Sequence, residues 1–264
     1  MISKVRQPVA TPPSGTLSRR WLLLALMAFV LVLLMRPPLP LVLWALPASV
    51  HCEQPSGTVW RGHCAQAWLQ RAGGQEPIKI QLGWQVLPAR LLRGRLAAQL
   101  HLARGDSVVD ALVQRSWGSL EVLSLQGTVR LEDQLLPAVP AGWHGTAALQ
   151  AVRLRLQGSA LMALEGRVRV AQLRSLIGQP IDYGTVIFDW PPTPGGALKP
   201  ASVTDEGGPL ALKATLTLQS TGAWQLDGTV AARPPVAAAL AAQLQLLGSA
   251  AADQQQQFSL AGLP

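Results

Sequence analysis

From Ser56 onward, apolar and polar residues alternate with a period of two, and this alternation is the strongest constraint on the fold of the chain. It is clearest over residues 78–86 and recurs over residues 152–156, 216–219 and 224–227. Successive side chains of a β-strand point to opposite faces of the sheet, so each segment predicts a strand with one buried and one wet face. The chain is therefore expected to be mainly β, a curved antiparallel meander.

A weak repeat that starts with glycine accompanies these segments. Several copies are about 18–21 residues apart, which is the length of two short strands with their turns. We expect each glycine to permit a turn or bulge before a new strand. Gly-Thr-Val starts at Gly57, Gly127, Gly184 and Gly228, and near variants start at Gly94, Gly145 and Gly166.

Only one or two short helices are expected. Residues 107–117 form one candidate, and residues 235–247 form a better one, with Pro235 at the start and Gly248 as terminator. A last strand is expected over residues 258–260. The Pro/Gly-rich segment in residues 191–200 is a candidate boundary, so one open sheet and two stacked β halves both remain open.

The first 36 residues predict a membrane anchor. Residues 21–35 carry no charge, begin at Trp21, end at Met35 and are flanked by arginines on both sides. An uncleaved signal anchor is favoured over a cleaved signal peptide, because no small-x-small cleavage site follows the apolar run. The expected order is a cytoplasmic segment (1–20), a transmembrane anchor (21–36), a membrane-proximal linker (37–55) and a β domain across the membrane (56–264).

Composition and charge exclude several classes. With 49% hydrophobic residues, the chain has too much apolar mass for a disordered protein. The net charge of +8 includes four basic residues among the first 20, and later arginines such as Arg153 and Arg155 alternate with apolar residues. This spacing indicates a solvated strand face, so no nucleic-acid partner is expected.

No motif for catalysis or for a cofactor is present. The chain has no G-x-S-x-G elbow, Walker loop, G-x-G-x-x-G or H-E-x-x-H. We therefore predict no catalytic, cofactor-binding or metal-binding residue.

The two cysteines follow two of the four histidines, at His51-Cys52 and His63-Cys64. Adjacent ligands point apart in most zinc sites, whose paired ligands are two to four residues apart. In an oxidising compartment the favoured outcome is a disulfide between Cys52 and Cys64, which would contribute on the order of 3 kcal/mol. Free thiols and a metal site are the alternatives.

Several short segments occur together in one order. The sequence reads SGTVWRG over residues 56–62, LGWQVLP over 82–88, LLRG over 91–94, DEGGPL over 205–210 and LQLLG over 244–248. With the N-terminal anchor, over about residues 20–262, the chain resembles protein N of the bacterial type II secretion system, the general secretion pathway protein N family. The matching residues are expected to be structural: Gly57, Thr58, Val59, Trp60, Gly62, Trp84, Asp205, Gly207, Gly208, Pro209 and Leu210.

The resemblance implies a non-enzymatic inner-membrane protein with a periplasmic β domain and no cofactor. It implies contact with the secretion proteins C, L and M and with the secretin D, in assembly of the periplasm-spanning complex. More distantly the chain resembles AsmA-like proteins, which implies a curved open sheet and, as the alternative function, lipid handling in an apolar groove. An open sheet has exposed edges, so strand addition is the docking mode that we expect.

Overall fold

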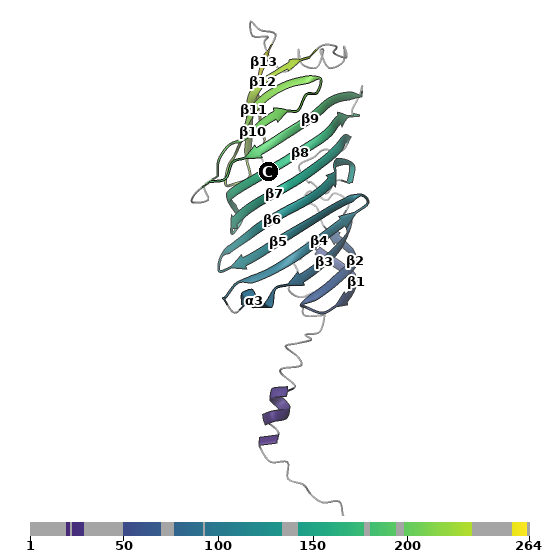
Figure 1. The fold of residues 1–264 in the computed structure, drawn as a ribbon, viewed down its shortest axis with the longest axis vertical. Helices are drawn as coiled ribbons and strands as arrows, with labels where there is room; N and C mark the ends of the chain where they lie inside the picture. The colour runs from purple at the N-terminus through teal and green to yellow at the C-terminus, as the bar shows by residue number, and fades with distance from the viewer. Residues whose placement is uncertain are drawn as a thin grey trace, which may run out of the picture.

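The computed structural model describes residues 20–21, 23–28, 50–69, 77–91, 93–133, 142–176, 180–193, 198–233 and 255–262. Within them, thirteen antiparallel strands form one sheet whose spatial order is the order of the chain (Figure 1). The strands are β1 (Val50–Gly57), β2 (Arg61–Leu69), β3 (Ile78–Val86), β4 (Leu96–Arg104), β5 (Ser107–Ser116), β6 (Ser119–Arg130), β7 (Trp143–Gln157), β8 (Ala160–Ser175), β9 (Ile181–Trp190), β10 (Ala201–Asp205), β11 (Leu210–Leu218), β12 (Trp224–Ala232) and β13 (Gln256–Gly262).

The sheet is single, so the expectation of a mainly β, open antiparallel meander is confirmed and the two stacked halves are not found. The Pro/Gly-rich segment after β9 does not divide the sheet. β9 and β10 pair directly with each other, from Asp189 opposite Ser202 to Val186 opposite Asp205. Figure 1 shows the strands lying obliquely, one after another along the long axis of a curved sheet.

The expected strands are confirmed. Residues 78–86 form β3, residues 152–156 lie in β7, residues 216–218 in β11, residues 224–227 in β12 and residues 258–260 in β13. The helix expected over residues 107–117 is wrong, because this segment is β5. Its Val109 and Ala111 are buried on one face, and the strand pairs with neighbours on both sides, which outweighs a weak helical pattern. The first strand, β1, starts at Val50, inside the range expected for the linker.

Helical structure is sparse in the described part of the chain. It comprises α3 (Pro88–Leu91), the 3-10 helix η2 (Leu131–Asp133), and residues 20–21 and 23–28. The helix expected over residues 235–247 and the LQLLG segment lie outside the described residues, as does Met35. Among the described helices, none has both the length and the apolar character needed to cross a bilayer.

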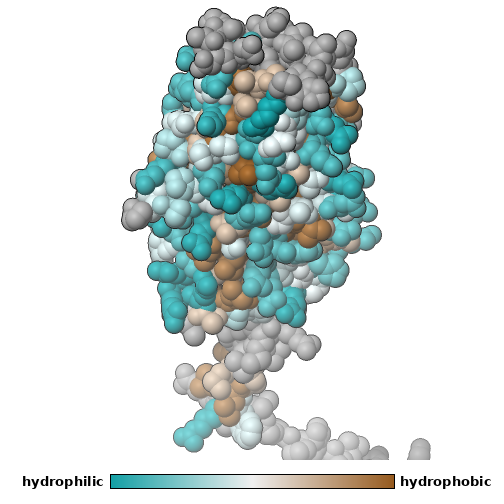
Figure 2. Space-filling view, turned by 45° about the horizontal axis from the view of Figure 1, so that its top comes forward, coloured by the Kyte–Doolittle hydropathy of each residue, from teal (hydrophilic) through white to brown (hydrophobic). Residues whose placement is uncertain are grey.

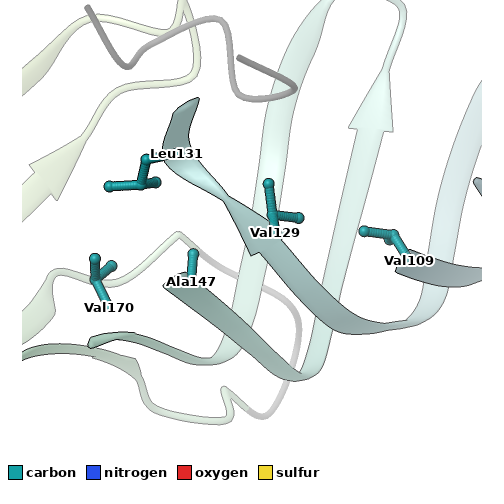
Figure 3. Packing of buried hydrophobic residues seen from close by; sticks show 5 residues of the cluster. All are labelled: Val109, Val129, Leu131, Ala147 and Val170. Carbon is teal, nitrogen blue, oxygen red and sulfur yellow. The ribbon is translucent and has the colours of Figure 1, made fainter. Parts of the chain in front are cut away.

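The core lies on one face of the sheet. Its central cluster contains one residue from each of β5, β6, η2, β7 and β8. Figure 3 shows the side chains of this cluster directed toward the same interior. Further clusters lie toward each end of the sheet, around Ile78 and Ile80 in β3 and around Ile181, Leu210 and Val230. The central cluster consists of Val109, Val129, Leu131, Ala147 and Val170.

Candidate functional site

A row of apolar side chains crosses the whole sheet on the face of the core. Each member is the direct cross-strand partner of the next, and every member is buried or half-buried. Because directly paired residues of antiparallel strands share a face, the row forms one continuous apolar line. This central row runs through Pro55, Cys64, Leu82, Leu102, Val109, Gly127, Leu149, Val168, Phe188, Val203, Ala214, Gly228 and Phe258.

Parallel stretches of paired apolar residues lie beside the central row. One runs from Trp84 through Leu100, Ala111 and Leu125 to Val152. Another runs from Ala201 through Leu216 and Leu226 and ends at Leu260 on the last strand. Figure 2 shows a band of hydrophobic surface that runs across the strands between hydrophilic margins. The sheet therefore offers one extended apolar face.

Arginines and carboxylates pair on the surface of the sheet. Arg167 Nη2 lies 3.1 Å from Asp189 Oδ2, directly across the β8–β9 ladder. Arg155 Nε lies 3.0 Å from Glu121 Oε1, and Arg169 Nε lies 2.6 Å from Glu206 Oε2. Three of the alternating arginines, Arg155, Arg167 and Arg169, are thus neutralised locally, whereas Arg153 donates to Leu123 O. Exposed ion pairs of this kind contribute little to stability.

Bulges in the long strands account for two glycines of the repeat, Gly145 and Gly166, whereas Gly57 and Gly94 lie at turns before a new strand, as expected. Ala151 in β7 and Gln172 in β8 have φ of 50° and 52°, and each lies at a register shift. Each bulge lies opposite a glycine: a Cβ on Gly166 would lie 2.9 Å from Ala151 O, and one on Gly145 would lie 3.2 Å from Gln172 O. These glycines lie inside strands, not before them, because bulges bend and twist a strand and need room on its neighbour.

The first motif of the resemblance forms a hairpin that a second segment holds in place. Gly57 pairs with Gly62, and the Thr58 N–H donates to Arg61 O at 2.7 Å. Trp84 Nε1 in β3 donates to the carbonyls of Thr58 and Val59, at 3.3 and 3.2 Å. The Val86 N–H donates to Trp60 O at 2.7 Å.

Gly62 provides the space for the Trp84 ring. A Cβ on Gly62 would lie 2.4 Å from Trp84 Cζ2, so the indole packs directly on the glycine. The segments 56–62 and 82–86, separate in sequence, therefore form one packed unit near the β1 edge.

The second motif, around Asp205, is a buried polar hub. The Asp205 side chain is 7% exposed and accepts hydrogen bonds from the backbone N–H groups of Gly207 (3.2 Å) and Leu212 (2.7 Å). Arg233 forms an ion pair with it and also donates to Gly208 O at 3.0 Å and Leu210 O at 2.6 Å. The Arg233 N–H donates to Pro209 O at 2.8 Å, so this arginine closes the turn between β10 and β11.

The turn also packs against β9. A Cβ on Gly184, whose φ is +81°, would lie 2.8 Å from Gly208 Cα. Arg233 is absent from the residues singled out in the sequence, because it lies far along the chain from Asp205 and no local pattern marks it.

The hub makes folding pH-dependent. Burial by itself would raise the pKa of Asp205, but the hydrogen bonds from Arg233, Leu212 and Gly207 outweigh it and lower that pKa below its usual value. A carboxyl with a lowered folded-state pKa stabilises the protein above its unfolded pKa of about 3.9, and the contribution is lost as pH falls through the folded value.

We expect Asp205→Asn to lower the free energy of unfolding at pH 7 by about 1–3 kcal/mol, since it weakens hydrogen bonds to a charged group. The difference from the wild type should shrink as the pH falls below about 4, because the unfolded carboxyl is protonated there first, and it should vanish once the pH is below the lowered pKa of the folded state. Urea unfolding at a series of pH values measures this. Asp189→Asn, which removes an exposed ion pair, serves as the control and should have a smaller effect. A difference that stays constant down to pH 2 would contradict the assignment.

The cysteines form a disulfide between the first two strands. Cys52 in β1 and Cys64 in β2 are joined, with their Cα atoms 5.8 Å apart. Cys64 is 1% exposed and belongs to the apolar cluster at this end of the sheet. The edge strand is therefore covalently attached to its neighbour.

These features define a class: an open-sheet β protein whose distinctive surfaces are an apolar face and two edges. Among the described residues, no three His, Cys, Asp or Glu side chains gather in a way that would hold a metal ion. The model of the family "Type II secretion system (T2SS), protein N" matches residues 48–260, which span all but the last two residues of the sheet. The chain belongs to this family, and the resemblance seen in the sequence is confirmed. No curated protein and no solved structure matches the chain.

Proposed function

We propose that this protein is a non-catalytic, inner-membrane-anchored subunit of the type II secretion system whose β domain lies in the periplasm. It contributes there to assembly of the periplasm-spanning complex that exports folded proteins. The family match over residues 48–260 is the observation that carries this proposal.

Two features of the chain support the location. The apolar run over residues 21–35 follows an N-terminal segment whose only charges are basic, which favours a cytoplasmic N-terminus. The Cys52–Cys64 disulfide suits an oxidising compartment such as the periplasm.

The partners that we propose are the secretion proteins C, L and M and the secretin D. The test is chemical crosslinking in native membranes, followed by affinity capture of the tagged chain and mass spectrometry. The matched control is residues 1–49 fused to an unrelated soluble domain, which keeps the anchor and lacks the sheet. Enrichment of these proteins with the full chain over the control supports the proposal. Equal recovery with both would show that the sheet is not the contacting part.

A second function, lipid handling, is favoured by one observation, the continuous apolar face. A row of paired apolar residues that crosses thirteen strands is an extended surface on which acyl chains could lie. The same captured material should then contain phospholipid or lipopolysaccharide in stoichiometric amount. Stoichiometric lipid without secretion proteins would favour this function over the scaffold.

A further inference from the structure

The two ends of the sheet differ in a way that bears on assembly. Among the described strands, β1 and β13 each have one neighbour, so each presents a row of backbone N–H and C=O groups on its outer side. Such edges pair readily with other strands unless the sequence protects them.

The β1 edge is protected. Pro55 lacks an N–H group, so it interrupts the row of donors. The preceding residue, Gln54, has φ of 52°, which departs from strand geometry. The disulfide from Cys52 to Cys64 further holds β1 against β2. An incoming strand would meet an irregular edge.

The β13 edge has none of these protections. The segment QQFSLAG contains no proline and no charged residue, and all seven of its residues pair with β12 in continuous register. Leu260, which ends a stretch of apolar cross-strand partners, is 43% exposed. Phe258 ends the central row in the same strand. The apolar face therefore stops at a regular, uncharged edge.

We propose that β13 pairs antiparallel with β13 of a second copy of this chain, about a two-fold axis at Ser259. In this register Phe258 faces Leu260 of the second copy, Gln257 faces Ala261, and Ser259 faces Ser259. Apolar residues then meet apolar residues on the core face, and no charge faces a like charge.

The partner is a second copy because antiparallel pairing of β13 with itself continues the apolar face from one copy to the other without a like-charge contact, and because the arrangement closes. Each copy uses the same surface, so the interface is isologous. Growth beyond two copies by edge pairing would need the β1 edge, which is protected. The proposal goes beyond the proposed function and does not depend on it.

The cysteine content of the chain gives a direct test. The chain has two cysteines, and both are in the disulfide, so an introduced cysteine is the only free thiol. In the full chain purified in mild detergent, Ser259→Cys should crosslink to a dimer with oxidant or a short bis-maleimide, because Cβ atoms of directly facing residues lie about 4.5–5.5 Å apart. Ala261→Cys alone should not, whereas a mixture of the Gln257→Cys and Ala261→Cys chains should.

A charge variant tests the same edge without crosslinking. Ser259→Lys places two lysines opposite each other at the two-fold axis, and it should weaken dimerisation, measured by sedimentation, by about tenfold or more. Thr215→Lys is the matched control, because Thr215 is the other cross-strand neighbour of Asp227 and lies inside the sheet, whereas Ser259 is at the edge and donates a hydrogen bond to Asp227 at 2.6 Å. The control should dimerise like the wild type.

A monomer at all concentrations with no Ser259→Cys dimer would overturn the proposal. So would crosslinking of Ser259→Cys in native membranes to a different protein and not to a second copy. A dimer without captured secretion proteins would leave this inference intact and contradict the proposed function.

Discussion

Replacing Gly127 with alanine is expected to lower the free energy of unfolding by about 2–5 kcal/mol, a large part of the stability of an ordinary domain. Gly127 lies inside β6 with φ of +144°, and a Cβ there would lie 2.1 Å from Val108 O and 2.8 Å from Val109 Cα. Both atoms are backbone atoms of β5 and cannot yield without breaking the ladder. The estimate adds the cost of positive φ, about 1–2 kcal/mol, to that of an overpacked site, about 1–3 kcal/mol.

Gly118→Ala separates these two costs. Gly118 also has a positive φ, +77°, but it lies in the turn between β5 and β6 with nothing within 4 Å of an added Cβ. Urea unfolding of both variants should give a loss of about 1–2 kcal/mol for Gly118→Ala and a clearly larger one for Gly127→Ala. Equal losses would mean that contact with β5 is not what requires glycine at position 127.

The Trp84→Ala variant is expected to lose about 3 kcal/mol of stability. The substitution removes the ring that packs on Gly62 and the donor for the carbonyls of Thr58 and Val59. The hairpin between β1 and β2 then loses its main contact with β3, apart from the ladder itself. Trp84→Phe should retain part of the stability, because it keeps an aromatic ring and loses the donor.

Trp117→Ala is the matched control for this prediction. Trp117 lies in the β5–β6 turn and is 96% exposed, so the same chemical change should alter stability by less than about 0.5 kcal/mol. Thermal and urea unfolding of the three variants give the comparison. A Trp84→Ala protein as stable as Trp117→Ala would show that the motif residues contact each other without stabilising the sheet.

The fold was predictable from the sequence where alternation is regular. Residues 78–86 read as a strand and form β3 with the same bounds, since each apolar residue there meets the core side. The prediction failed at residues 107–117, where apolar Val108 is exposed beside buried Val109, so the alternation is weak and pairing on both sides decides the structure. The sequence predicted a turn or bulge at each glycine, but it did not predict that Ala151 and Gln172 would be the bulged residues, because they lie on the strands that face Gly166 and Gly145.

The sequence indicated which residues belong to the candidate site, but not how those residues contact each other. The segments at 56–62, at Trp84 and at 205–210 were singled out as structural, but their contacts come from long-range pairing. Arg233 and the apolar row emerge only once thirteen strands are in register. The row in particular draws one residue from each strand, and no window of sequence contains more than two or three of its members.

The chain-order sheet has a consequence for how the protein forms. Every described strand pairs only with the strands directly before and after it in the chain. Pairing each strand with the one before it needs none of the residues still to come, so folding can proceed in step with the appearance of the polypeptide, N-terminus first. The β1–β2 hairpin, joined by the disulfide, is then the first part to form, and β13, whose outer edge carries no proline and no charge, is the last.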